Sequence, residues 1–381
     1  MHVLTINHEF PPIGGGAGNA CWFVARELVQ QGVQITVLTS AYEAMPRCEI
    51  RDGVHIIRVP AWRKHQLESS TVELLSFVSS ALWHSRSIVK KEKPDLLHTY
   101  FGIPSGAIAR IIQRQTGLPY LISFRGRDVH GGKGLDSDGI GGLLRWISKP
   151  VWRKANALVA NSDGLKKIAL KITPDVAIDV IPNGIDTLHF KPGTPSANGP
   201  VRLLFVGRLE PYKGLNDLIV ALSMLKMQTA VPFSATIVGD GALRNSLPQD
   251  VQKHHLQDRV TFAGPKAREA MPGIYQQADI FVLPSIIEGM SNAILEAMAT
   301  GLPTVATAIP GSDDLVQPGK TGFLVPPAKP EALAQALQTL LEQPALRQTM
   351  GQNARREAEN QSWVSVAHAY NTLYQRLIKP K

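Results

Sequence analysis

The sequence predicts an α/β fold with two domains, each built on a doubly wound parallel sheet with helices on both faces. Three observations support this prediction. At 381 residues the chain is longer than one ordinary hydrophobic core. Short, β-prone apolar runs alternate with helical segments through both halves. A stretch rich in Pro, Gly, Ser and Asn, at 191–200, separates the two alternating patterns.

These observations divide the chain into four parts. We predict an N-terminal domain at 1–190, a linker at 191–200, a C-terminal domain at 201–353 and a C-terminal helix in 354–381. That helix, expected at about 354–378, is long enough to cross back to the first domain. Ligands of open α/β sheets bind at the carboxyl ends of the strands, so the two domains should face each other across a cleft.

In the N-terminal domain the alternation begins with the first residues. We expect strands at 3–7, 33–39, 54–59, 95–99, 120–124, 157–161 and 176–181. We expect helices at 19–31, 69–92, 105–115, 143–154 and 162–171.

The helix at 69–92 allows two interpretations. It carries an apolar stripe formed by Val72, Leu75, Val78 and Leu82, and it ends in the basic run 90–93. Packing of the stripe into the core is the simpler interpretation. The alternative is a membrane-facing basic helix, because basic amphipathic helices bind anionic lipid electrostatically.

The C-terminal domain repeats the pattern. We expect strands at 201–206, 234–238, 260–263, 280–283, 304–307 and 323–325, with a helix at 216–226. A further helix follows the fourth of these strands, because Ser291 is a suitable N-cap and Gly301 with Pro303 ends the helical pattern.

Composition excludes several classes of protein. Hydrophobic residues make up 44% of the chain and charged residues 19%, as in a globular protein. The two cysteines, Cys21 and Cys48, form no disulfide scaffold or metal motif, which fits a reducing compartment. The sequence has no run of 18 apolar residues and no signal-peptide pattern. We therefore expect a cytoplasmic protein.

The net charge of +9 suits an anionic partner. Phosphorylated ligands and an anionic membrane surface both remain open, and the second would place the protein peripherally at the inner face of the membrane. The basic residues are scattered and follow no nucleic-acid-binding signature, so we expect no nucleic-acid partner.

Three consecutive glycines, Gly14 to Gly16, follow the first strand and precede the first helix. Bare backbone N–H groups at a helix N-terminus can approach a phosphate. The loop matches neither a dinucleotide-binding fingerprint nor a Walker loop. We interpret it as a phosphate-binding loop, and a flexible loop without a ligand is the alternative.

Two basic residues, Arg208 and Lys213, follow the first strand of the second domain. Arg offers a planar donor fork and Lys a mobile point charge, so together they suit a diphosphate. By themselves they could equally be two solvated surface residues.

Two carboxylates, Glu288 and Glu296, lie eight residues apart after the strand at 280–283. Glu288 precedes the helix, and Glu296 lies within the almost wholly apolar run 293–299. A buried carboxylate needs a partner, so Glu296 either pairs with a cation or faces a polar ligand. The alternative for the pair is a helix N-terminal acid and a salt-bridged glutamate.

Taken together, these segments resemble the retaining glycosyltransferases of family 4, which have the GT-B fold of two Rossmann-like domains. The matching segments are the glycine loop at 14–18, Gly207–Gly214, Val180–Asp186, the Glu288/Glu296 pair and Ala299–Pro303. The resemblance covers nearly the whole chain. It implies a hexosyltransferase that moves a sugar from a UDP- or GDP-type donor to an acceptor hydroxyl with retention. The implied acceptor is a lipid-linked or cell-surface glycan precursor, as in polysaccharide or lipopolysaccharide synthesis.

The resemblance also implies a role for each matching residue. Arg208 and Lys213 would hold the donor diphosphate and act with Glu288 in catalysis. Glu288 would bind the hydroxyls of the transferred sugar, and Glu296 the ribose hydroxyls. Gly15 and Gly16 would approach the distal phosphate from the other domain. Gly264 would begin a segment beside the base.

The chain departs from the family pattern at Arg125, where many members have a His near the reacting sugar. Arg is not deprotonated in proteins, so it cannot be a general base, but it can donate to a hydroxyl, phosphate or acceptor anion. A salt bridge to Asp128 is the alternative. His98, at the end of the strand at 95–99, orients a loop or contacts substrate. Arg125, Asp128 and His98 are thus the candidates on the acceptor side.

No His, Cys, Asp or Glu cluster in the sequence has metal-ligand spacing. We therefore predict a reaction without metal or cofactor, the nucleotide sugar being a substrate. Two alternatives remain open at this point. One is a nucleotide-sugar 2-epimerase of the same fold, which would act without an acceptor, and the other is a non-catalytic GT-B partner protein.

Overall fold

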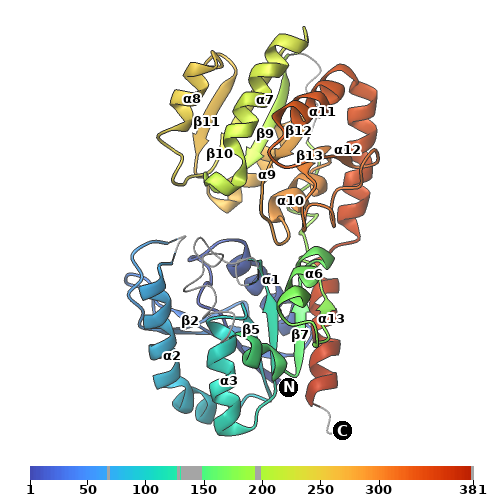
Figure 1. Cartoon of the computed structure of the whole chain (residues 1–381). Coiled ribbons are helices and arrows are strands. Elements are labelled where there is room, and N and C mark those ends of the chain that lie inside the picture. The colour runs from blue at the N-terminus through green and yellow to red at the C-terminus, as the bar shows by residue number, and fades with distance from the viewer. Residues whose placement is uncertain (67–68, 127–128, 130–147, 194–198, 379–381) are drawn as a thin grey trace. The chain divides into compact units, whose positions relative to one another are not determined.

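The computed structural model describes residues 1–66, 69–126, 129, 148–193 and 199–378. The chain forms two compact units, each with its own α/β core (Figure 1). The N-terminal unit comprises Met1–Gly184 and Trp363–Lys381, and the C-terminal unit comprises Ile185–Ser362. The predicted boundary at 190 thus lies inside the second unit, and residues 194–198 of the predicted linker lie outside the described residues.

The N-terminal unit contains an eight-stranded sheet with the order β3-β4-β2-β1-β5-β6-β7-β8. Its strands are β1 (His2–Ile6), β2 (Gln34–Ser40), β3 (Cys48–Arg51), β4 (Val54–Val59), β5 (Leu96–Tyr100), β6 (Tyr120–Phe124), β7 (Ala157–Ala160) and β8 (Asp179–Val180). All neighbours pair in parallel except β3, which runs antiparallel to β4. The central strands are buried on both faces, which explains their nearly continuous apolar sequences.

Helices cover both faces of this sheet. Helices α1 (Gly16–Gln30) and α13 (Trp363–Ile378) pack on one face. Helices α2 (Thr71–Glu92), α3 (Ser105–Thr116) and α6 (Asp163–Ile172) pack on the other. The final helix therefore completes the core of the N-terminal unit, although it is distant in sequence.

The C-terminal unit contains a six-stranded, wholly parallel sheet with the order β11-β10-β9-β12-β13-β14. Its strands are β9 (Val201–Val206), β10 (Phe233–Val238), β11 (Val260–Gly264), β12 (Ile280–Leu283), β13 (Thr304–Thr307) and β14 (Gly322–Val325). Its helices are α7 (Leu215–Gln228), α8 (Leu247–Lys253), α9 (Met271–Gln276), α10 (Asn292–Ala299), α11 (Pro330–Glu342) and α12 (Pro344–Glu359). Helix α7 contacts α8 and α11, while α10 contacts α9 and α12. Both domains thus have the predicted parallel-sheet α/β architecture.

Each sheet has a point at which the strand order reverses. In the N-terminal unit it lies at β1, between β2 and β5, and in the C-terminal unit at β9, between β10 and β12. Chains leaving neighbouring strands in opposite directions open a crevice at such a point, and ligands of these folds bind there. The loops that follow β1, β9 and β12 are the ones that carry the glycines, Lys213 and Glu288.

One long C-terminal helix was the wrong prediction for 354–378. Helix α12 ends at Glu359, and α13 begins at Trp363. The break has a structural cause: the backbone of Ile185 donates to the Gln361 carbonyl at 2.8 Å and forms a bridge with Ser362. This pairing uses an extended conformation that a helix cannot provide.

The apolar stripe predicted for the core on α2 was also only partly right. Val72 and Leu75 are 60% and 61% exposed, while Val78 and Leu82 are partly buried. The face that enters the core carries Phe77, Ala81 and Ile88 instead. Two apolar stripes on one helix cannot be ranked by periodicity alone.

Candidate active site

Lys213 lies in the loop that leaves β9, within a short 3₁₀ turn formed by Pro211–Lys213. Gly214 ends this turn at φ +67°, a conformation that favours glycine. A Cβ on Gly214 would lie 2.0 Å from the Pro284 carbonyl oxygen, so only glycine lets this loop approach the end of β12. The Ile286 backbone then donates to the Tyr212 carbonyl at 2.7 Å. The loops after β9 and β12 are therefore held together by backbone.

This approach brings Lys213 and Glu288 into an ion pair. Their side chains are 12% and 11% exposed, so the pair lies almost wholly beneath the surface. The Ser285 hydroxyl also donates to the Glu288 carboxylate, at 2.8 Å. The Thr307 hydroxyl in turn donates to the Ser285 carbonyl. The two residues assigned to the diphosphate and to the transferred sugar are thus direct neighbours.

Arg208 and Lys213 lie near the same aromatic ring, that of Tyr212. The Arg208 guanidinium is 5.5 Å from the centre of the Tyr212 ring, and the Lys213 ammonium is 5.8 Å from that ring. Among the described residues Arg208 forms no ion pair, in contrast to Lys213. The cluster of Arg208, Lys213 and Glu288 therefore carries a net positive charge, as expected for a group that binds a diphosphate.

Glu296 lies on α10, most of whose residues are buried in the core. Tyr275 donates a hydrogen bond to its Oε2 at 2.9 Å. Burial raises the pKa of the Glu296 carboxyl, while the charge of Arg268 and the hydrogen bond from Tyr275 oppose that rise. Tyr275 and Arg268 thus favour the ionised form of Glu296, but together they do not fully offset the cost of burying its charge.

Gly264 ends β11 with φ +69°. Its carbonyl accepts from the backbone of Gly239 at 3.0 Å, which joins the ends of β10 and β11. Nothing lies within 4 Å of a Cβ built on Gly264, so the position faces open space. This is the geometry that a flat ligand beside the strand end would require.

The glycine loop of the N-terminal unit is already associated with an anion of the protein. The Gly15 backbone donates to Glu9 Oε2 at 3.4 Å, and Glu9 is 8% exposed. Gly14 is at φ +88°, and a Cβ there would lie 2.5 Å from Glu9 Cβ. The carboxylate of Glu9 therefore lies beside the N-terminus of α1, which starts at Gly16, where a phosphate was predicted.

His98 is 1% exposed, and both of its ring nitrogens have protein partners. Nδ1 is 2.7 Å from the Tyr374 hydroxyl, and Nε2 is 2.8 Å from the Ser123 hydroxyl. Burial, together with the charge of Arg125, lowers the pKa of His98 well below its usual value. His98 is therefore a neutral, buried residue that joins β5 to α13 and to β6.

Arg125 is bonded to two other segments of the same unit. It donates to the Asn183 side chain at 2.8 Å and to the Tyr370 hydroxyl at 3.3 Å. Its guanidinium lies 4.3 Å from the centre of the Tyr100 ring. Asp128, its predicted alternative partner, lies outside the described residues. The Arg125 fork thus links the end of β6 with α13 and with the chain that follows β8.

The chain is similar to known proteins in both sequence and structure. The family model described as Glycosyl transferases group 1 matches residues 187–357, and the model described as Glycosyl transferase 4-like domain matches 15–184. The D-inositol 3-phosphate glycosyltransferase of Kineococcus radiotolerans is 29% identical, over 100% of this chain and 95% of its own. The chain is a GT4-type glycosyltransferase. The resemblance found in the sequence is therefore confirmed.

Two further similarities complete the comparison. The Escherichia coli UDP-Gal:alpha-D-GlcNAc-diphosphoundecaprenol alpha-1,3-galactosyltransferase is 32% identical over 62% of this chain and 64% of its own. Sucrose-phosphate synthase from Thermosynechococcus elongatus superposes with a TM-score of 0.86 at 24% identity, over 99% of this chain and 98% of its own. The glycosyltransferase therefore has the GT-B fold.

Sequence reasoning missed several groups that position the site of this glycosyltransferase. Glu9, Tyr275, Ser285, Asn183 and Tyr370 all bond to predicted site residues. Ser285 directly follows Pro284 at the end of β12, so its place in the sequence could have indicated it. Glu9 is six residues from Gly15, and Asn183 lies within the matching segment Val180–Asp186, but no local pattern marks either contact. Tyr275 and Tyr370 come from segments distant in sequence.

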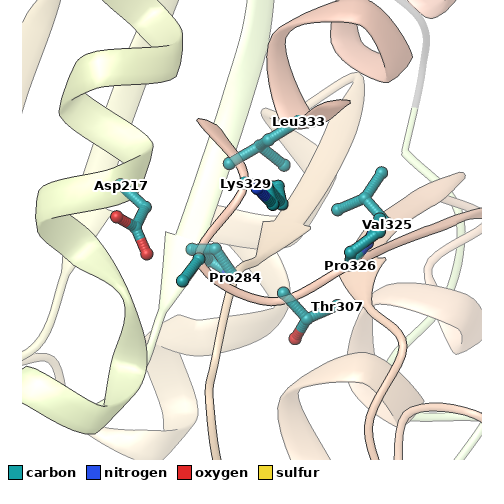
Figure 2. A pocket seen from close by; sticks show the side chains of 8 residues that line it. Asp217, Pro284, Thr307, Val325, Pro326, Lys329 and Leu333 are labelled. Carbon is teal, nitrogen blue, oxygen red and sulfur yellow. The ribbon is translucent and has the colours of Figure 1, made fainter. Parts of the chain in front are cut away.

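A small cavity of about 10 Å³ lies at the carboxyl edge of the C-terminal sheet (Figure 2). Pro284, Thr307 and Val325, at the ends of three strands, line it together with Asp217 from α7. Burial and the charge of Glu331 raise the pKa of Asp217. The cavity has room for about one water molecule and is too small for a sugar or a nucleotide.

The described residues include no group of three or more His, Cys, Asp or Glu that could hold a metal ion. None of the described helices is both long and apolar enough to span a membrane. Metal-independent transfer remains a prediction that only an assay can test.

Proposed function

We propose that this glycosyltransferase moves a hexosyl group from a nucleoside diphosphate sugar to an acceptor hydroxyl with retention at the anomeric carbon. The observation that carries the proposal is the contact between Lys213 and Glu288. A cation that suits a phosphate directly beside a carboxylate that suits sugar hydroxyls matches the two parts of such a donor. UDP-sugars are the first donors to test, since the name of the E. coli relative contains UDP-Gal.

Each predicted residue keeps a defined part in this proposal. Arg208 and Lys213 neutralise the diphosphate, and Glu288 accepts hydrogen bonds from the transferred sugar. Glu296 accepts from the ribose hydroxyls, with Tyr275 orienting its carboxylate. The two ribose hydroxyls would donate further hydrogen bonds to the Glu296 carboxylate. Its present partners only partly offset the cost of burying its charge.

The glycine positions have supporting roles. Gly264 leaves space for the base at the end of β11. Gly15 and Gly16 approach the distal phosphate, and for this to occur the carboxylate of Glu9 has to give up its bond to Gly15.

The transfer step can be written with all atoms accounted for. The bond between the sugar C1 and the phosphate oxygen breaks, and a bond from C1 to the acceptor oxygen forms on the same face of the ring. The acceptor hydroxyl gives its proton to the departing phosphate oxygen, so no protein base is required. Arg208 and Lys213 stabilise the negative charge that develops on the leaving diphosphate.

On the acceptor side we propose that Arg125 donates to the acceptor or to its phosphate, and Asp128 remains a second candidate for contact with the acceptor. His98 does not contact substrate in this proposal. It positions Ser123 and α13 through hydrogen bonds to the Ser123 and Tyr374 hydroxyls. The acceptor that we propose is a lipid-linked or cell-surface glycan precursor at the cytoplasmic face of the membrane. The names of the two curated relatives, which contain an inositol phosphate and a diphosphate-linked lipid, support an anionic acceptor.

A thermal-shift screen of nucleoside diphosphates and their sugars tests the donor. A ligand at about 100 times its Kd stabilises the folded protein by about 2.7 kcal/mol. The acceptor is then screened with the stabilising donor, and NMR of the product gives the configuration at C1. An inverted product, or turnover of the donor to an epimer without any acceptor, would refute the proposal.

A further inference from the structure

Helix α2 of the N-terminal unit exposes large apolar side chains along one face. Val72, Leu75 and Trp83 are 60%, 61% and 85% exposed. They recur at spacings that place them on a single face of a helix, and Arg86 and Lys90 continue that face toward the C-terminal end. We call these five residues the α2 face. Isolated apolar residues on a surface are ordinary, but a row that includes tryptophan needs an explanation.

A second exposed tryptophan lies beside the α2 face. Trp62 is 75% exposed, and its backbone N–H donates to the Ser76 hydroxyl of α2 at 2.9 Å. The segment before α2 is thereby fixed against the first half of the helix. Tryptophan is enriched where an apolar phase meets water, because its ring is apolar while its N–H needs a polar partner.

Among the described residues of α2, the exposed charged side chains are all basic. Arg86, Lys90 and Lys91 are exposed. The two acids of α2 are turned inward: Glu73 is buried in the capping box with Ser70, and Glu92 accepts from Thr36 and bonds to His55 at 3.1 Å. Glu92 is also 4.0 Å from Lys91.

Helix α3, which lies beside α2, extends this basic surface (Figure 1). It adds Arg110 and Arg114 and contains no acid. The solvent side of α2 and α3 is thus basic as well as partly apolar.

We propose that the α2 face docks this glycosyltransferase on an anionic phospholipid bilayer. Trp62, Trp83, Val72 and Leu75 enter the boundary between headgroups and acyl chains, and the basic residues contact the headgroups. The complementary charges favour a bilayer over a second copy of the chain, whose own α2 face would be equally basic. The proposal extends the function of the protein beyond the sugar-transfer site and does not depend on which donor it uses.

Flotation with vesicles tests this surface directly. The whole protein should bind vesicles that contain phosphatidylglycerol and not vesicles of phosphatidylcholine alone. Binding should weaken as salt rises from 0.05 to 0.5 M (about a threefold decrease in screening length), because salt screens exposed charges. Each lysine near an anionic surface contributes about fivefold in affinity, so Lys90→Glu with Lys91→Glu should weaken binding at least about 25-fold.

Matched controls separate the surface from general effects of charge and hydrophobicity. Lys167→Glu with Lys253→Glu changes the net charge equally and should bind nearly as wild type. Leu75→Ser with Trp83→Ser should abolish most binding, whereas Met227→Ser, at an 85% exposed position of the other unit, should not. Trp83→Phe should keep binding and lose much of the fluorescence quenching by brominated lipid.

Several results would overturn the proposal. The first is failure of the wild-type protein to bind anionic vesicles. The second is an equal loss of vesicle binding in the α2 variants and in their controls. A third is self-association that Leu75→Ser with Trp83→Ser abolishes, without vesicle binding, since a second copy would then cover the face. Binding of the nucleoside diphosphate should be unchanged in all these variants, so a failed docking test leaves the donor site unaffected.

Discussion

In the C-terminal unit two charged groups at the carboxyl edge of the sheet, Lys213 and Glu288, bond to each other. In the N-terminal unit His98 and Arg125, at the corresponding edge, bond to residues brought from distant parts of the chain. Lys213 and Glu288 form an ion pair from loops that follow adjacent strands. His98 lies in β5, also next to the strand-order reversal, yet it is sealed by Tyr374 and Tyr370 of α13.

This difference affects what each edge can do. An ion pair between two loops can exchange its partners for a ligand of suitable charge, because the ligand supplies both the anion and the hydroxyls. A buried neutral histidine with two hydrogen bonds cannot exchange partners without exposing unpaired polar groups, which is costly. The carboxyl edge of the C-terminal sheet is therefore suited to bind a ligand. The buried residues at the corresponding edge of the N-terminal sheet are suited to stabilise the fold.

The largest expected effect follows from breaking the Lys213–Glu288 pair. We expect Glu288→Gln to lower kcat at least about 100-fold. The fold should survive with a lower midpoint of thermal unfolding, because Ser285 can still bond to the amide while the nearly buried Lys213 loses its anion. Lys213→Ala should lower both activity and stability, because it leaves the nearly buried Glu288 without its cation. Thermal unfolding and steady-state kinetics of both variants measure the two effects.

The double variant sharpens this test. Lys213→Ala combined with Glu288→Gln removes both charges, so it should regain stability relative to Lys213→Ala while remaining inactive. Recovery of stability without recovery of activity would show that the pair acts as a coupled unit. Glu288→Gln with wild-type turnover would show that the pair is purely structural.

The next largest effect is expected for Arg208, which has no ion pair among the described residues. Arg208→Ala should weaken binding of the nucleoside diphosphate by about 1.5–3 kcal/mol, the usual loss for a hydrogen bond to a charged group. Calorimetry measures this affinity. Arg153→Ala is the matched control, because it removes one positive charge from an exposed pair with Asp175 in the other unit. Donor affinity within twofold of wild type in Arg208→Ala would exclude a contact with the diphosphate.

The sequence was sufficient for the parallel sheets and for the residues that follow their strands. Strands buried on both faces have apolar runs, and glycines and charges at strand ends are local signals. Arg208, Lys213, Glu288 and Gly214 belong to such signals, and the structure brings the first three together.

What could not be predicted depends on contacts that no local pattern marks, most of them distant in sequence. Glu9 is only six residues from Gly15, yet nothing in that segment indicates that its carboxylate accepts from the Gly15 N–H. Nothing near His98 indicates that Tyr374 will cover it. The break between α12 and α13 has no Pro or Gly to mark it and arises from pairing with Ile185. The antiparallel edge strand β3 is short and mixed in polarity, so its pattern is weak.

Arg125 is the place where the N-terminal unit can be tested for substrate binding. Its fork reaches both Asn183 and Tyr370, and a lysine can reproduce neither the plane nor both bonds. We expect Arg125→Lys to lower kcat/KM at least tenfold, about 1.4 kcal/mol. Kinetics with the identified acceptor and thermal unfolding should be measured together.

The two measurements distinguish the roles of Arg125. Lower activity with normal thermal stability indicates a substrate contact, whereas equal losses of activity and stability indicate that the fork only holds Asn183 and Tyr370. Full activity and stability would exclude both roles. If Arg125→His preserves turnover, the departure from the family pattern marks a substrate preference and leaves the mechanism unchanged.

The smallest expected effect concerns Glu296, and its sign depends on pH. The pKa of this carboxyl is raised in the folded protein, chiefly by burial. The unfolded chain therefore releases this proton at a lower pH than the folded chain, and ionisation of Glu296 costs stability. That cost is absent below the usual carboxyl pKa, grows as pH rises through the interval up to the raised pKa, and is constant above it.

Glu296→Gln removes the titration while keeping a side chain of similar size that can still accept from Tyr275. The free energy of unfolding of the variant should therefore increase relative to that of wild type as pH rises from 4 to 8. The difference between the two proteins should be smallest near pH 4. Its affinity for the nucleoside diphosphate should fall about fivefold, or about 1 kcal/mol, because an amide accepts fewer hydrogen bonds from a ribose diol than a carboxylate does. Urea unfolding at each pH and calorimetry at pH 8 measure the two changes. A stability difference that is independent of pH would show that Glu296 is not the titrating group, and unchanged nucleotide affinity would leave it as a residue of the core.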